Sequence, residues 1–224
     1  MKLSYTALAT SVPDALSQQN EMRNQLVISG EPKKVDLIAA VDVSFDSQTD
    51  MQFGTLVIWD RQSQTVVEKQ TSRMKARFPY ISGLLAYREL PALLPLFEQL
   101  TVTPDIILCD GQGIAHPRGF GLACHLGLIL GIPSIGCAKT RLVGEYRPVG
   151  TNKGERSPLF YKGSEVGMVL RTRTNVAPLF ISPGHLCSID SAVEIILKHC
   201  LTRYRLPEPS RLAHLLSKAE FRRG

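Results

Sequence analysis

The sequence has few cysteines, and those it has are not spaced as metal ligands. Five cysteines occur among its 224 residues, none of them forms a CxxC pair, and no group of cysteines and histidines has the spacing of metal ligands. A zinc site is therefore not expected. Several of the cysteines lie in apolar segments such as IILCD and SIGCAK, which is typical of buried free thiols in a reducing compartment.

Long hydrophobic runs are also absent. No apolar segment approaches the about twenty residues that a helix needs to cross a bilayer. The N-terminal segment MKLSYTALATSVPDALSQQ has no apolar core of the kind found in signal peptides. The sequence also contains no internal repeat, low-complexity tract or linker. We therefore expect a single domain over residues 1–224, a cytoplasmic location, no membrane partner and a monomer.

Acidic residues are fewer than basic residues. Asp and Glu number 20 and Lys and Arg number 26, so the formal net charge is +6. An excess of positive charge favours a polyanionic partner such as nucleic acid, although many basic proteins bind none. Hydrophobic residues make up 44% of the chain, which is ordinary for a globular domain with a sizeable core.

The order of the apolar segments predicts an α/β fold. Three strand candidates come first, joined by short turns, and predict an antiparallel meander. Later strands alternate with helices, which is typical of parallel crossovers. The expected fold is a mixed central sheet flanked by helices, an arrangement shared by ribonuclease H-like nucleases. The predicted strands are 36–45, 54–59, 65–70, 105–110, 133–138, 166–171 and 179–181, and the predicted helices are 13–27, 84–100 (kinked or broken by Pro91 and Pro95), 122–130, 188–201 and a short one after Pro207.

Three carboxylates occur in unusual contexts. Asp42 lies within the apolar run LIAAVDVSF, Asp110 ends the run DIILCD, and Glu89 lies on the helix between those strands. A buried carboxylate is costly unless it is paired or bound to a metal. Together these acids would form an oxygen-rich site suited to Mg²⁺ and to metal-assisted hydrolysis of a phosphodiester. Taken singly, each acid could instead cap a turn, start a loop or lie on a helix surface.

At these residues the sequence resembles the endonuclease V family, which cuts DNA at deoxyinosine. The resemblance covers residues 10–220 in the family's order, and the matching strings are VDVSF, FPYISG, AYRELP, CDGQGIAHPRGFGLACHLG, GCAKTRLVG, ISPGH and YRLPEPSRLAH. The resemblance implies a ribonuclease H-like fold and dependence on Mg²⁺, for which Mn²⁺ can substitute. It also implies hydrolysis of the second phosphodiester bond 3′ to the lesion, leaving 3′-hydroxyl and 5′-phosphate ends.

The resemblance also implies roles for single residues. Asp42 and Asp110 match the family's metal-binding acids, and Glu89 matches its third catalytic carboxylate. His214 occupies a position that carries an acid in some members, so it could ligate the metal or position water. Lys139 follows the apolar strand SIGCA and could bind the scissile phosphate or extend along the surface into solvent.

Two loops are candidates for recognition of the substrate base. The string PYISG, with Tyr80, Ile81 and Gly83, precedes the helix of Glu89. An aromatic side chain there could fill the gap that an extruded base leaves in the stack, or it could pack on the sheet edge. Ser82 stands where the family often has proline, which should loosen the loop.

The second loop, DGQGIAHPRGFG, is rich in glycine. Gly111, Gly113 and Gly121 could let backbone groups approach a ligand closely, or they could serve only a tight turn. His116 in the same loop could contact the base or a phosphate. The hypothesis of an endonuclease for deoxyinosine-containing DNA stands beside two alternatives: an endoribonuclease for inosine in RNA, and a non-catalytic lesion-binding module. Because all three acid positions are filled, catalysis is favoured over binding alone.

Overall fold

The computed structural model describes residues 8–223, so residues 1–7 of the segment examined for a signal peptide lie outside it. Its strands are β1 (Leu37–Phe45), β2 (Met51–Asp60), β3 (Thr65–Lys75), β4 (Ile106–Cys109), β5 (Ser134–Ala138), β6 (Arg156–Tyr161), β7 (Ser164–Leu170) and β8 (Leu179–His185). Its helices are α1 (Val12–Arg23), α2 (Leu85–Glu98), α3 (Leu122–Leu130), α4 (Ile189–His199) and α5 (Glu208–Arg223).

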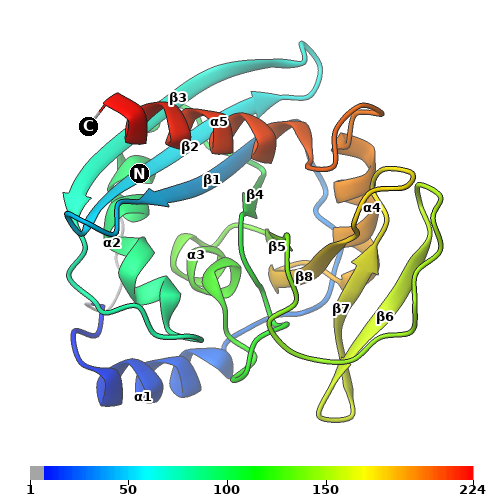
Figure 1. The fold of residues 1–224 in the computed structure, drawn as a ribbon, viewed down its shortest axis with the longest axis horizontal. Helices are drawn as coiled ribbons and strands as arrows, with labels where there is room; N and C mark the ends of the chain where they lie inside the picture. The colour runs from blue at the N-terminus through cyan, green and yellow to red at the C-terminus, as the bar shows by residue number, and fades with distance from the viewer. Residues whose placement is uncertain (1–7, 224) are drawn as a thin grey trace.

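All the strands belong to one mixed sheet in the order β3-β2-β1-β4-β5-β8-β7-β6 (Figure 1). β1, β2 and β3 pair antiparallel, whereas β1, β4 and β5 pair parallel. The chain therefore forms a meander first and parallel crossovers through β4 and β5, but it returns to antiparallel pairing at β8, β7 and β6, which was not expected. This result confirms the predicted α/β class.

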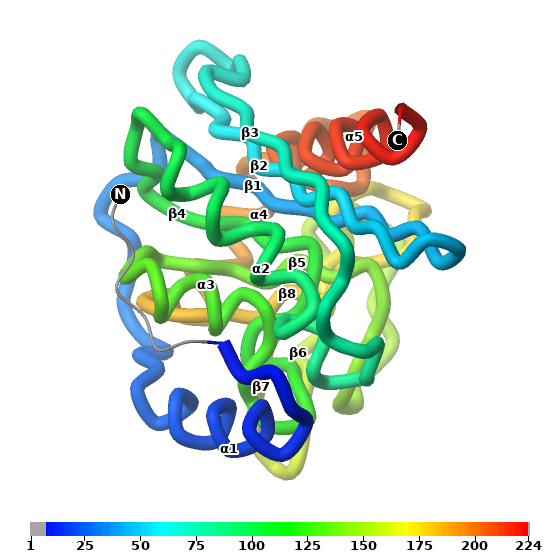
Figure 2. Tube along the Cα trace, turned by 90° about the vertical axis from the view of Figure 1, so that its left-hand side faces the viewer, coloured from blue at the N-terminus to red at the C-terminus, as the bar shows by residue number. Residues whose placement is uncertain are grey.

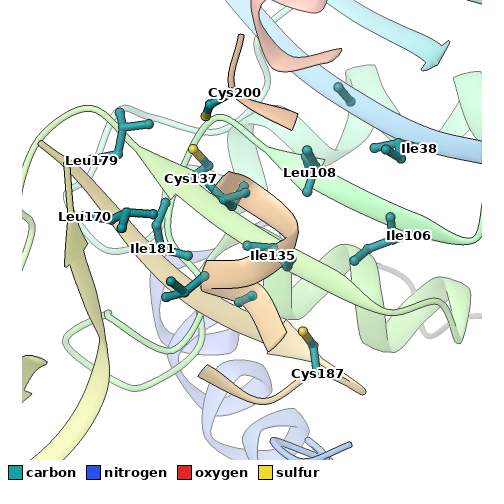
Figure 3. Close-up of a cluster of buried hydrophobic side chains, with 14 of the residues drawn as sticks. Ile38, Ile106, Leu108, Ile135, Cys137, Leu170, Leu179, Ile181, Cys187 and Cys200 are labelled. Carbon is teal, nitrogen blue, oxygen red and sulfur yellow. The ribbon is translucent and has the colours of Figure 1, made fainter. Parts of the chain in front are cut away.

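Alternate residues of the central strands face two helical layers. Ile38 and Ala40 of β1 belong to a core that includes residues of α4 and α5 (Figure 3). Ala39 and Val41 belong to a second core with α2 and α3. A strand buried on both faces needs apolar residues at successive positions, so the near-continuous run of β1 follows from its central place in the sheet. Figure 2 shows α2 and α3 on one side of the strands, with α1 beyond them.

One expectation about helices was wrong, and a second was wrong in part. The last helix is not short: α5 has 16 residues and crosses β1 and β2 (Figure 1). Its buried face carries small side chains such as Ala213 and Ser217, so the usual pattern of large apolar residues is missing. The second helix is not broken, because α2 continues through Pro91 and Pro95. Its tertiary packing outweighs the loss of two backbone donors, since most of its residues are buried.

Two strand expectations also needed correction. β6 was not predicted, because Pro158 in its middle argues against a strand; β6 lies at the edge of the sheet, where proline is tolerated. β8 was predicted to end at Ile181, yet it continues to His185 through Pro183. Its pairing with β7 stops at Ile181, so at Pro183 no partner on that side needs a donor. Within residues 8–223, no helix has the length and apolar character needed to span a membrane.

Candidate active site

Asp42 and Asp110 lie side by side because of the alternation of side chains along the strands and the register in which β1 and β4 pair. Side chains alternate between the two faces of a strand, and Asp42 is an even number of residues after Ile38 and Ala40. Its side chain therefore points, like theirs, to the α4–α5 side of the sheet. The parallel register pairs Val41 with Cys109, and Asp110 follows directly after β4. Two residues that each interrupt an apolar run are thus brought to the same end of adjacent strands.

Helix α5 completes this cluster from above the sheet. Nδ1 of His214 lies 3.2 Å from Oδ2 of Asp42. Ser217, one turn further along α5, donates a hydrogen bond to the same carboxylate oxygen. Thr55 Oγ1 donates at 3.1 Å to the carbonyl oxygens of Asp42 and Ala213, and this contact fixes α5 against β1 and β2.

The cluster offers a set of ligand atoms that could hold one divalent cation. Asp42, Asp110 and His214 each offer one ligand atom, and these atoms lie within 4.8 Å of one another. We call these three residues the carboxylate centre. A divalent cation held there would have oxygen ligands from the two carboxylates and one nitrogen ligand from the imidazole, with water or substrate oxygens completing the coordination shell.

The charges around the centre are unbalanced. Burial, together with the negative charges of Asp42 and Asp110, raises the pKa of Glu89 to about 8. Burial also raises the pKa of Asp110, against the opposing effect of Lys139. The ammonium of Lys139 pairs with Oδ2 of Asp110. Lys139 opposes only part of the rise in pKa, and a bound cation would stabilise the ionised forms of these acids.

A cavity of about 420 Å³ opens beside Glu89 and Asp110. Its other walls come from three loops, so we call it the loop cavity. Among the predicted residues, its lining includes Tyr80, Ile81, Gly83, Gly111, His116, Gly121 and Lys139. Gly113 does not line it. A larger cavity of about 760 Å³, lined by Lys33 and His199 among others, lies near the opposite end of β1 and holds none of the predicted site residues.

Within the first loop, the predicted residues differ in their surroundings. Tyr80 is 73% exposed and is free to contact a ligand. Ile81 is half-buried and packs toward Phe78 and Leu84 in a small core that also includes residues of α1. Gly83 has a φ of +80°, a left-handed conformation that favours glycine.

His116 uses both of its ring nitrogens within the protein. Nδ1 accepts hydrogen bonds from the backbone N–H groups of Arg118 and Phe120, at 3.2 and 3.4 Å. The proton therefore resides on Nε2, which donates to the carbonyl oxygen of Gly83 at 2.9 Å. Burial, assisted by the charge of Arg118, lowers the pKa of His116 to about 4, so the ring stays neutral at pH 7.

The glycines of the second loop have different roles. A Cβ at Gly113 would lie 2.0 Å from the carbonyl oxygen of Pro183, and one at Gly121 would lie 2.3 Å from that of Gln112. These two glycines allow backbone to pack directly on backbone. A Cβ at Gly111 would meet only the side chain of Leu122, at 3.8 Å.

Sequence reasoning missed three residues at the site. Ser217 lies three positions after His214, so the two residues share one face of α5. A prediction of the full length of that helix would have shown this. Gln112 lines the loop cavity and donates to the carbonyl oxygen of Thr140 at 3.1 Å. Leu142 is exposed beside the same cavity, and no pattern in its loop singles it out.

Acids at the ends of adjacent parallel strands, in a sheet that begins as a meander, define a hydrolytic site of the ribonuclease H-like class. The Endonuclease V family profile matches residues 20–215. The chain therefore belongs to the Endonuclease V family and is a nuclease of that family.

Known relatives resemble the chain over nearly its whole length. An Endonuclease V of Myxococcus xanthus is 45% identical over 207 residues, which cover 92% of this chain and 88% of the relative. The crystal structure of the Bacillus subtilis protein superposes with a TM-score of 0.93 at 30% identity, covering 99% and 98% of the two chains. A Ciona intestinalis Endonuclease V variant, in complex with a DNA containing an inosine followed by a ribo-adenosine, has a TM-score of 0.81 at 25% identity and coverage of 95% and 97%.

Proposed function

We propose that this protein is a DNA repair endonuclease that uses Mg²⁺ to cut a strand beside deoxyinosine. The bond hydrolysed is the second phosphodiester 3′ to the lesion, and the products carry 3′-hydroxyl and 5′-phosphate ends. The observation that carries the proposal is the carboxylate centre, whose ligand atoms lie within 4.8 Å of one another beside a cavity open to solvent. The inosine-containing DNA bound by the Ciona relative supports the choice of substrate.

Different residues of the chain would bind the cation, bind the scissile phosphate and accept a proton. When bound, a divalent cation activates a water nucleophile and stabilises charge on the phosphate oxygens. Asp42, Asp110 and His214 would hold it. Lys139 is placed to exchange its pairing with Asp110 for the scissile phosphate, where its charge offsets the developing negative charge. Glu89 lines the loop cavity beside Asp110. A bound cation would favour the ionised form of Glu89, and in that form its carboxylate can accept a proton from the attacking water.

The loop cavity would hold the extruded base. Its volume of about 420 Å³ is ample for a purine ring with its ordered water. Tyr80, exposed at its rim, would stack against the bases that remain in the strand. The neutral Nε2–H of His116 is already directed at Gly83, so this ring shapes the cavity wall and does not hydrogen-bond to the base.

The test is cleavage of end-labelled strands that carry one deoxyinosine, deoxyadenosine or riboinosine at the same position. We expect cutting of the deoxyinosine strand in Mg²⁺ or Mn²⁺, none in EDTA, and none of the deoxyadenosine strand. Preferred cutting of the riboinosine strand would replace the proposal with an endoribonuclease. Tight binding to deoxyinosine without any cutting would replace it with a lesion-binding module.

A further inference from the structure

Gln19 on α1 is fully buried between two loops that are distant in the sequence. Its Nε2 donates hydrogen bonds to the carbonyl oxygens of Gly83 and Phe120, each at 3.1 Å. Its Oε1 accepts from Nε of Arg118. Both halves of the amide are thus used, and their partners identify which atom is nitrogen and which is oxygen.

The carbonyl oxygen of Gly83 is the point at which these contacts converge. It accepts from Gln19, from Nε2 of His116 at 2.9 Å, and from Nη2 of Arg118. Gly83 ends the loop that carries Tyr80, and His116, Arg118 and Phe120 belong to the glycine-rich loop. A buried network whose members are all satisfied holds one arrangement rigidly, so the gap between the two loops is set here.

Helix α1 is anchored independently of Gln19. Ala15 packs in the small core with Phe78, Leu84 and Tyr87. The hydroxyl of Tyr87 donates to the carbonyl oxygen of Ala15 at 3.0 Å. In Figures 1 and 2, α1 lies apart from the sheet and from the strands that carry the carboxylate centre. Loss of the Gln19 amide should therefore loosen the two loops without detaching the helix.

We propose that Gln19 is a positioning residue that determines specificity, because it holds the two walls of the loop cavity at the separation an inosine base requires. The inference rests on the proposed function, and it assigns to α1 a part in recognition. Gln19 is not part of the carboxylate centre and does not itself line the loop cavity; it reaches the cavity wall only through the carbonyl group of Gly83. Its loss should weaken binding of the damaged base while leaving hydrolysis of a bound strand almost unchanged.

The main test compares Gln19→Met with Asn20→Met. Methionine keeps the length of Gln19 and removes all three of its hydrogen bonds, while the neighbouring Asn20 is exposed on the same helix and serves as the control. Binding is measured on deoxyinosine and deoxyadenosine strands in Ca²⁺ without cleavage, and kcat and KM are measured in Mg²⁺. We expect about a tenfold rise in Kd and KM for deoxyinosine, kcat within about twofold, and no change for deoxyadenosine or for Asn20→Met.

A double-mutant cycle adds a second route to the same answer. Arg118→Met removes the partner of Oε1 and one donor to Gly83, on a side chain that is partly exposed, so it tests the network even if Gln19→Met does not fold. Combined with Gln19→Met it should cost little more than the larger single change, since the two residues act in one network.

Three results would be decisive. An unchanged Kd for deoxyinosine with only a lower Tm would make Gln19 a purely structural residue and overturn the inference. Equal weakening of binding to both strands would do the same. A wild-type protein that cuts no deoxyinosine strand would instead refute the proposed function, so the two failures can be told apart.

Discussion

The carboxylate centre and the loop cavity are held by different kinds of structure. Asp42 lies within a strand and Asp110 directly after one, so the backbone hydrogen bonds of the sheet set their positions. The walls of the loop cavity are irregular segments, and one carbonyl group, that of Gly83, gathers three side-chain donors to hold them. The comparison shows that regular backbone sets the positions of the two acids, whereas a few particular side chains hold the walls of the loop cavity.

The two regions also differ in electrostatics. At and beside the carboxylate centre, burial and the neighbouring acids raise the pKa of Asp110 and raise that of Glu89 to about 8, so the charged forms are unfavourable without a cation. In the loop cavity, the pKa of His116 is lowered to about 4 and its hydrogen bonds are complete within the protein. A bound cation would therefore stabilise the ionised acids of the first region, whereas hydrogen bonds within the protein already hold the second.

The largest effect is expected from Asp110→Asn, which tests whether the two regions are separable. The amide cannot carry the negative charge that a divalent cation requires, so kcat should fall at least about 1000-fold. The strand position is unchanged, so the Kd for a deoxyinosine strand, measured in Ca²⁺, should stay within about threefold. Single-turnover cleavage and equilibrium binding measure the two parts. A parallel loss of binding would mean that the regions are not independent.

The two acids of the carboxylate centre could be predicted from the apolar pattern of the strands that carry them. Asp42 and Asp110 interrupt apolar runs whose other members are buried on both faces of the sheet, and a strand places alternate residues on one face. Their meeting in space required only that the two strands be neighbours in parallel register, as they are. His214 entered through the family resemblance, because the sequence pattern gave no sign of how long α5 is.

The loop cavity could be predicted only as a pair of motifs. Tyr80 and the glycines stood out by residue type, but their contacts depend on which backbone groups face each other across the gap. Gly113 illustrates the limit, since it packs against Pro183 and not against the cavity. Nothing in the sequence pattern indicated a role for Gln19. It lies on a polar helix, and the two carbonyl groups that it binds are 64 and 101 residues away in the sequence.

The next largest effect is expected on the free energy of unfolding, when alanine replaces either of two glycines in the glycine-rich loop. Gly113→Ala would place a Cβ 2.0 Å from a backbone oxygen, so it should lower the free energy of unfolding by about 2–3 kcal/mol. Gly111→Ala is the matched control, because its Cβ would meet only ordinary contact at 3.8 Å and its stability should be unchanged. Urea unfolding of both variants measures this. Equal stability of the two would show that close backbone packing is not what Gly113 serves.

Tyr80→Ala should affect recognition without affecting stability. The side chain is 73% exposed, so its removal should change the free energy of unfolding by less than about 0.5 kcal/mol. Loss of a stacking ring should raise the Kd for a deoxyinosine strand about tenfold. Tyr80→Phe keeps the ring and should bind like the wild type. If Tyr80→Phe were as weak as Tyr80→Ala, the hydroxyl group and not stacking would be responsible.

The smallest effect concerns the pH dependence of the free energy of unfolding, to which the buried His125 of α3 contributes. His125 is fully buried against Tyr87 and Phe120, with ring centroids 4.9 and 4.5 Å away, and neither ring nitrogen has a partner among residues 8–223. Burial lowers its pKa from 6.5 to about 3. Between these values the unfolded chain takes up a proton that the folded protein does not, so this contribution to stability is complete above pH 6.5 and is lost as the pH falls. His125→Phe should reduce the slope of unfolding free energy near pH 5 by about 1.4 kcal/mol per pH unit. Urea titrations between pH 4.5 and 7.5 measure both slopes, and equal slopes would mean that His125 is protonated in the folded protein.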